Sequence, residues 1–125
     1  MAEALWEAFG DGQWESHSAG AKPSGYVHPL AIRAMGELEH GGKGFDLSSY
    51  ESKHVDNFAG QEFDIVVTVC DNAKEACPAF PGAKESLHWP FFDPADAEGD
   101  EAAQLVVFRR VRDEIANKIQ SYLNT

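Results

Sequence analysis

One β-branched run, Ile65-Val66-Val67-Thr68-Val69, constrains the fold of this chain more than any other feature. A short apolar run of this kind is typical of a buried strand, because helices cover both faces of a parallel sheet. The predicted elements follow the order α, β, α, short α, β, loop, β, α, which is the alternation of a parallel sheet. We therefore predict an α/β fold, a three-layer sandwich with a mostly parallel sheet.

Helices with apolar faces and two weaker strands are expected around this run. The expected helices are residues 1–9, a segment that starts at His28-Pro29, a turn near 47–53 and residues 100–123, and the weaker strands are 15–21 and 85–89. Only the strand near 63–69 has the apolar character that a central parallel strand needs. The pattern therefore looks like an α/β fold that lacks its first strand.

Length and charge limit the classes of function. A chain of 125 residues is one domain, and its 21 acidic and 10 basic residues give a net charge of −11. This charge argues against binding to nucleic acid or anionic membrane surfaces, whose phosphates repel it. We find no bilayer-length apolar run and no export signal, so we expect a cytoplasmic protein. The five histidines show no metal-ligand spacing, and we expect no metal and no cofactor.

The chain contains two cysteines, Cys70 and Cys77, and Cys70 directly follows the apolar strand. The carboxyl end of a parallel strand is the edge at which open α/β sheets bind ligands. Two thiols placed in this way can exchange between dithiol and disulfide. Two buried, inert cysteines that act as small hydrophobic residues fit the same spacing equally well.

With these residues in view, the chain resembles the thioredoxin-coupled arsenate reductases, which share the low-molecular-weight tyrosine phosphatase fold. The matching stretches are Met-Ala-Glu-Ala at 1–4, Ser-Ala-Gly at 18–20, His-Pro-Leu-Ala-Ile-Arg at 28–33, Asp-Leu-Ser at 46–48 through Ser-Lys-His at 52–54, Val-Cys-Asp at 69–71 with Cys-Pro at 77–78, and His-Trp-Pro at 88–90 with Asp-Pro-Ala at 93–95. Phosphatases of this fold look similar but usually lack the paired cysteines, so the reductase branch is favoured.

The resemblance also implies a missing piece. In this family an apolar strand and a Cys-x5-Arg loop come before the Met-Ala-Glu helix, and the 125 residues hold no counterpart of either. We therefore expect an N-terminally truncated single domain that is inactive by itself and binds arsenate or phosphate only if the loop is supplied. The sheet edges exposed by the loss favour a homodimer, or a rearranged sheet that pairs the remaining strands directly.

The resemblance assigns roles to three residues. Cys70 would be the second thiol of the cysteine relay, Cys77 the third, and Asp93 the general acid, with thioredoxin as the reductant. Asp93 stands before Pro94, however, which is also a common arrangement for a helix N-cap. Two other functions stay open: a non-catalytic redox or interaction module with a reversible Cys70–Cys77 disulfide, and a phosphatase relative. We expect Trp89 and Phe91-Phe92 to pack rather than to line a site.

Overall fold

The computed structural model describes residues 1–10, 12–19, 27–40, 43–47, 50, 53–58, 60–69 and 82–124. In chain order the elements are α1 (Ala2–Phe9), α2 (Pro29–Gly36), β1 (Glu39–His40), β2 (Lys43–Gly44), the 3-10 turn η1 (Val55–Phe58), β3 (Phe63–Thr68), β4 (Ala83–His88), the 3-10 turn η2 (Pro94–Asp96) and α3 (Glu101–Leu123). The three α-helices, of which only α3 is long, and the parallel strands β3 and β4 confirm the sequence prediction of helices combined with a parallel sheet.

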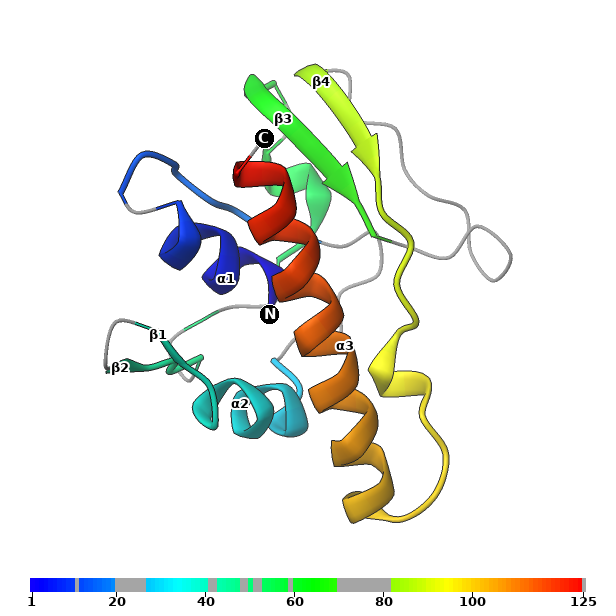
Figure 1. Cartoon of the computed structure of the whole chain (residues 1–125). Coiled ribbons are helices and arrows are strands. Elements are labelled where there is room, and N and C mark those ends of the chain that lie inside the picture. Colours follow the sequence, from blue (N-terminus) through cyan, green and yellow to red (C-terminus); the bar gives the residue numbers. More distant parts are fainter. Residues whose placement is uncertain are drawn as a thin grey trace.

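The helices pack on one another and form the core. Both α1 and α2 contact α3, and Figure 1 shows them side by side along this long helix. The buried apolar residues are Ala4, Leu5, Leu30, Ala31, Ala34, Met35, Leu47, Leu105, Phe108, Val111, Ile115 and Ile119. All of them except Leu47 lie on these helices, and those of α2 and α3 stand at the positions where the helical period of apolar residues predicts an inward face. We call this part of the molecule the helical body.

Side-chain caps fix where two of the helices begin. His28 Nδ1 accepts a hydrogen bond from the Leu30 amide at 3.1 Å, and Pro29 occupies the first position of α2. Asp100 Oδ1 accepts a hydrogen bond from the Ala103 amide at 2.9 Å at the start of α3. Each cap satisfies an amide that has no partner within its helix, so the local sequence sets these boundaries.

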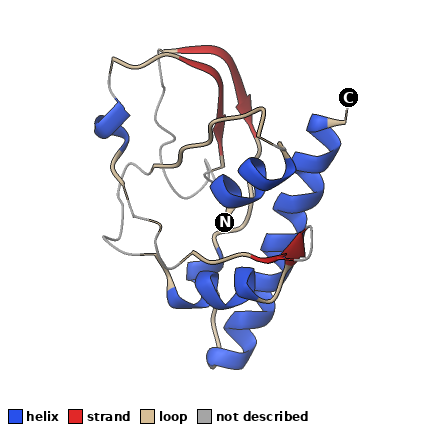
Figure 2. Ribbon diagram, turned by 90° about the vertical axis from the view of Figure 1, so that its left-hand side faces the viewer, coloured by secondary structure: helices blue, strands red, loops and turns tan. Residues whose placement is uncertain are grey.

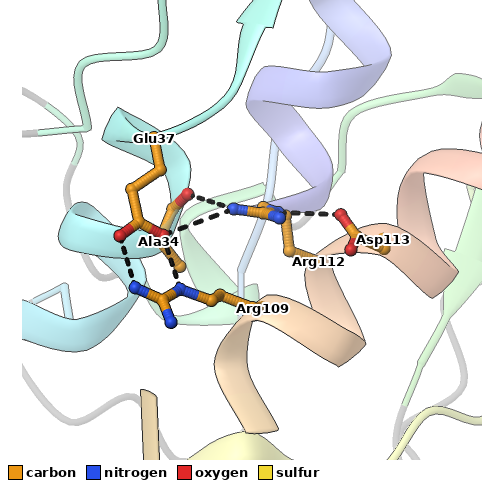
Figure 3. Close-up of polar contacts among 5 residues, drawn as sticks. All are labelled: Ala34, Glu37, Arg109, Arg112 and Asp113. Atoms are coloured by element: carbon orange, nitrogen blue, oxygen red, sulfur yellow. Dashed lines mark hydrogen bonds and ion pairs between the residues drawn. The ribbon is translucent and has the colours of Figure 1, made fainter. Parts of the chain in front are cut away.

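An arginine clasp, formed by Glu37, Arg109 and Arg112, joins the end of α2 to α3 (Figure 3). Arg109 donates two hydrogen bonds to the Glu37 carboxylate, at 2.7 Å from Nε and 2.6 Å from Nη2. Arg112 donates to the Ala34 carbonyl at 2.7 Å, and its side chain is only 12% exposed. This carbonyl belongs to the last turn of α2, so the guanidinium stabilises the negative end of that helix.

β3 and β4 form a parallel pair whose register runs from Phe63 opposite Ala83 to Thr68 opposite His88. Figure 2 shows this pair beyond the helices, at one end of the molecule. No residue of either strand is buried. The prediction that the apolar run is a buried strand is therefore wrong, because the apolar helix faces are used in packing against one another and β3 pairs with β4 alone among the described strands.

Elsewhere the described residues differ from the sequence prediction in one expected strand and in one unexpected pair. Residues 15–19 form no strand, so the remaining strands do not pair directly across the expected gap. The predicted helical turn near 47–53 lies largely outside the described residues; within them, the Tyr50 amide donates to the Leu47 carbonyl at 3.0 Å, which marks a turn. A small antiparallel pair, β1 with β2, was not expected. Short runs of small or polar residues carry little information about strand pairing, because whether such a run forms a strand depends on the strand beside it.

Within the described part of the chain, no helix combines the length and the apolar character needed to cross a bilayer.

Candidate active site

The carboxyl ends of β3 and β4 meet at one edge of the sheet. Their ladder continues past both strands, because the Trp89 amide donates to the Thr68 carbonyl at 2.8 Å and the Phe91 amide to the Val69 carbonyl at 3.3 Å. Open parallel sheets bind ligands at this edge, where successive loops leave the strands. The structure therefore brings Thr68 and Val69 together with the segment that starts at Trp89 at the same edge of the sheet.

Thr68 and His88 face each other at this edge. Their register places them opposite, and Thr68 Oγ1 lies 2.7 Å from His88 Nδ1. The same hydroxyl is 3.4 Å from the Leu87 carbonyl, to which it donates. A hydroxyl has one hydrogen and two acceptor lone pairs, so Oγ1 can make both contacts; which of Oγ1 and Nδ1 donates in the shorter one depends on the tautomer of His88. The pair holds an exposed imidazole beside the strand ends, and sequence reasoning missed it.

Asp93 lies four residues beyond Trp89 and is exposed. Its Oδ1 accepts a hydrogen bond from the Ala95 amide at 3.0 Å, and Pro94 occupies the first position of η2. The N-cap interpretation of Asp93 is therefore confirmed. In this cap the carboxylate acts as the acceptor of a backbone hydrogen bond.

The two predicted thiols, Cys70 and Cys77, lie outside the described residues. Their roles stay predictions. The described residues that flank them are Val69, which directly precedes Cys70, and Gly82, where the next described range begins.

An aromatic cluster ties this edge to the helical body. Trp89 stacks on Trp6 of α1 with ring centroids 5.9 Å apart, and it meets Tyr122 of α3 edge-on at 5.7 Å. Lys118 Nζ lies 5.5 Å from the centre of the Trp89 ring. Trp14 meets Trp6 edge-on at 5.6 Å, so all three tryptophans of the chain share one cluster. Trp89 and Phe91 pack against the core, as expected, whereas Phe92 is exposed.

Burial also affects a tyrosine of this cluster. The pKa of the Tyr122 hydroxyl is raised, first by loss of hydration and then by the negative charge of Glu85. Tyr122 is therefore a neutral aromatic neighbour of Trp89 at physiological pH.

A second polar group, missed as a cluster by sequence reasoning, gathers at the start of α1. Glu3 Oε1 accepts a hydrogen bond from Ser18 Oγ at 2.5 Å and lies 3.7 Å from Lys53 Nζ. The Lys53 and Glu3 side chains are only 24% and 13% exposed. The three residues belong to three different stretches that match the arsenate reductases in sequence, at 1–4, 18–20 and 46–54, and this match was the only sign in the sequence that they act together. Together they fix the first turn of α1 against two loops.

Tyr50 adds a further contact to α1, since its hydroxyl donates to Glu7 Oε2 at 3.5 Å. Loss of hydration, followed by the charges of Glu7 and Glu3, raises the pKa of Tyr50. The phenol is therefore the donor in this contact at neutral pH.

Comparison with known proteins identifies the class. A family model described as low molecular weight phosphotyrosine protein phosphatase matches residues 1–125, so the chain belongs to this family. Within it, the curated relatives point to one branch. An arsenate reductase of Halalkalibacterium halodurans is 42% identical over 125 residues, and one of Bacillus subtilis is 36% identical, each match covering 100% of this chain and 86% of the relative.

Solved structures agree with the curated relatives. The crystal structure of an arsenate reductase from Archaeoglobus fulgidus matches 99% of this chain and 88% of that protein, with a TM-score of 0.73 and 27% sequence identity. A second structure, of an arsenate reductase in its reduced state, matches with a TM-score of 0.67 and 25% identity. The predicted resemblance to the arsenate reductases and the predicted α/β fold are both confirmed.

Proposed function

We propose that this chain supplies the second and third thiols of an arsenate-reducing cysteine relay. Its curated relatives are arsenate reductases along its whole length, and this is the observation that carries the proposal. In the relay, a thiolate of a Cys-x5-Arg loop attacks arsenate and forms a covalent adduct. Cys70 attacks the sulfur of that adduct, the electron pair of the S–As bond passes to arsenic, and arsenite leaves.

Cys77 then takes over the disulfide. Its thiolate attacks Cys70, the loop thiolate is released, and a Cys70–Cys77 disulfide remains, which thioredoxin reduces with two electrons. A reducing compartment such as the cytoplasm suits this cycle. The position of Val69 at the carboxyl edge of the sheet supports the assignment of Cys70, because this is the usual ligand-binding edge and Cys70 follows Val69 directly in the sequence.

Asp93 is the proposed general acid, which protonates the oxygen that leaves arsenic. Its exposure at the sheet edge supports this role. The variant Asp93→Asn keeps an oxygen that accepts from the Ala95 amide and removes the transferable proton. We expect Asp93→Asn to retain the stability of the chain and to lower the rate of arsenate reduction about 100-fold or more in a chain that carries the Cys-x5-Arg loop.

Residues 1–125 alone are expected to turn over no arsenate. Neither of their two cysteines is followed by arginine six positions later, so the first thiol and the oxyanion-binding guanidinium are both absent from these residues. The test joins a segment with a strand and a Cys-x5-Arg loop upstream of Met1 and follows NADPH oxidation with arsenate, thioredoxin and thioredoxin reductase. We expect turnover by the extended chain, none by residues 1–125, and none by the extended chain with Cys70→Ser. Turnover by the unextended chain would overturn the proposal.

A second candidate is a non-catalytic redox module, favoured by the presence of two cysteines without a Cys-x5-Arg loop. It predicts a thioredoxin-reducible Cys70–Cys77 disulfide with no affinity for arsenate or phosphate. A phosphatase relative would differ again, since Cys70→Ser would leave its activity nearly unchanged. Measuring disulfide reduction and oxyanion binding on the same sample separates these functions.

We also propose that a second copy of the chain pairs along the edge of β3 that faces away from β4, giving a homodimer. The support is that β3 pairs with one strand only in the described part of the chain. Sedimentation across a hundredfold range of concentration tests this, and a monomer throughout would refute it.

A further inference from the structure

Two histidines of the described chain cap a helical segment through a ring nitrogen. At the start of α2, His28 Nδ1 accepts a hydrogen bond from the Leu30 amide at 3.1 Å. At the start of η1, His54 Nδ1 accepts one from the Asp56 amide at 3.0 Å. An imidazole nitrogen accepts only while it carries no hydrogen, and a protonated imidazole carries hydrogen on both nitrogens. Because histidine ordinarily changes its charge between about pH 5 and 8, such a cap depends on pH near neutrality.

The surroundings of the two imidazoles differ. His54 is 42% exposed, and its Nδ1 also lies 3.4 Å from Asp56 Oδ2. When His54 is protonated, Nδ1 becomes a donor to this carboxylate, so an ion pair replaces the lost cap. His28 is half-buried, and the centroid of its ring lies 4.7 Å from that of the buried Phe108 on α3. Among the described residues, no carboxylate bonds to the His28 ring to replace its cap in the same way.

The charged groups on the helices around His28 are paired elsewhere. They are Arg33 on α2 and Glu101, Arg109, Arg110 and Arg112 on the first half of α3. Arg33 lies 3.7 Å from Glu101, Arg110 lies 3.6 Å from Glu114, and the other two arginines belong to the arginine clasp. None of these contacts includes the His28 ring, so in this part of the structure no facing charge offsets the protonation of that ring.

We propose that His28 is a pH switch at the start of α2, which holds the first turn while the imidazole is neutral and releases it when the imidazole is protonated. Protonation removes the acceptor of the Leu30 amide, which the helix itself cannot satisfy. It also places a positive charge at the positive end of the helix dipole. The face of the Phe108 ring attracts a cation, but this single contact offsets only part of the two losses. Residues 29–32 therefore loosen below neutral pH.

The other end of α2 stays fixed over the same range of pH. The hydrogen bonds from Arg109 hold the pKa of Glu37 below its ordinary value, so this carboxylate keeps its charge and its contacts while His28 is protonated. The switch therefore opens one end of a helix whose buried Ala34 and Met35 remain packed. It is independent of the cysteine chemistry of the proposed function.

Nuclear magnetic resonance of the unmodified chain tests the switch. Long-range ¹H–¹⁵N spectra report which nitrogen of His28 carries hydrogen, and hydrogen exchange, corrected for its intrinsic rate, gives the protection factor of each amide. We expect the protection of the Leu30 amide to fall about fivefold or more from about pH 8 to about pH 5.5, as loss of a cap predicts. The Ala103 amide, which Asp100 caps at 2.9 Å, is the internal control, because carboxylates ordinarily stay ionised over this range.

His28→Asn is the matched variant, since its side-chain oxygen accepts from the same amide at either pH. We expect its Leu30 protection to stay within about twofold between the two pH values, whereas His54→Asn keeps the full loss at Leu30. Equal protection of Leu30 at both pH values in the unmodified chain refutes the switch, and so does a loss of the same size in His28→Asn. If His28→Asn does not fold, the comparison of Leu30 with Ala103 in the unmodified chain decides alone.

Discussion

The helical body and the sheet end are packed very differently. Every buried apolar side chain among the described residues lies on α1, α2 or α3, or is Leu47. At the sheet end, Ile65, Val66 and Val67 are only half-buried, and Val69 and Phe92 are exposed. The contrast indicates that the helices provide most of the buried apolar contacts that stabilise the described part of the chain.

Trp89 is the main side-chain link between the two regions. Its amide extends the strand ladder by donating to the Thr68 carbonyl at 2.8 Å, and its ring packs against Trp6 and Tyr122 of the helical body. The aromatic cluster therefore joins the sheet edge to the helical body, next to Phe91, which also packs against the core.

The largest effect is expected from the core of the helical body. Phe108 is 2% exposed, and the centroid of its ring lies 4.7 Å from the centroid of the His28 ring. Phe108→Ala leaves a cavity there and is expected to lower the free energy of unfolding by about 3–5 kcal/mol. Val67→Ala in β3, which removes half-buried methyl groups, is expected to cost only about 1 kcal/mol.

Urea unfolding measures both changes, and Val106→Ala is the matched control on α3. Its side chain is 59% exposed, so we expect a change within about 0.5 kcal/mol. If Val67→Ala proved as destabilising as Phe108→Ala, the sheet end would belong to the core and the contrast between the two regions would be lost.

The second effect concerns the link itself. Trp89→Leu keeps an apolar side chain but removes the stack on Trp6 and the edge contact with Tyr122, at a cost of about 1–2 kcal/mol. Hydrogen exchange is expected to quicken more for the amides of β4 than for those of α3. Trp14→Leu is the control, since Trp14 contacts Trp6 but lies outside the strand ladder. Equal acceleration in α3 and β4 would contradict a separate link.

The sequence predicts the helical body better than the sheet end, for a physical reason. The inward stripe of α3, with Leu105, Phe108 and Val111, and the cap by Asp100 depend on residues a few positions apart. The cap by Asp93 also depends on neighbouring residues, and for this reason the sequence predicted Asp93 correctly as an N-cap. The β-branched run of β3 predicts a strand, but what covers a strand is decided by distant parts of the chain.

Long-range polar contacts leave no local signal. Arg109 and Glu37 are 72 positions apart, and no spacing rule connects them. Thr68 and His88 become partners only through the parallel register, which places them opposite each other. At the candidate site, therefore, Asp93 could be found from its neighbours and from the motif match, whereas the Thr68–His88 pair required the structure.

The third effect is a pH dependence of the helical body. The hydrogen bonds from Arg109, and to a lesser degree the positive charges of Arg109, Arg112 and Arg33, hold the pKa of Glu37 below its ordinary value of 4.5. The carboxylate therefore stabilises the fold above about pH 4.5, and this contribution is lost as the pH falls through the lowered pKa of the folded chain.

Glu37→Gln is expected to lower the Tm at pH 7 by less than Trp89→Leu does, and the difference from the unmutated chain should shrink towards pH 3. Thermal unfolding at pH 7, 4.5 and 3 measures this. Glu98→Gln is the control, because it removes one charge from an exposed residue outside the clasp. A Tm difference that grew in acid would show that the clasp acts through something other than the carboxylate charge.

The smallest effect is expected at the sheet end, where Lys84 Nζ lies 3.4 Å from Asp64 Oδ1 across the two strands. The side chains are 73% and 78% exposed, so water screens the pair and Lys84→Gln is expected to change the free energy of unfolding by less than about 0.5 kcal/mol. Urea unfolding at low salt and at 1 M salt measures this, and any difference should vanish at the higher salt, where the screening length is about 3 Å. A change of more than about 1 kcal/mol, or one that persisted in salt, would mean that electrostatics holds the sheet end in place of the packing it lacks.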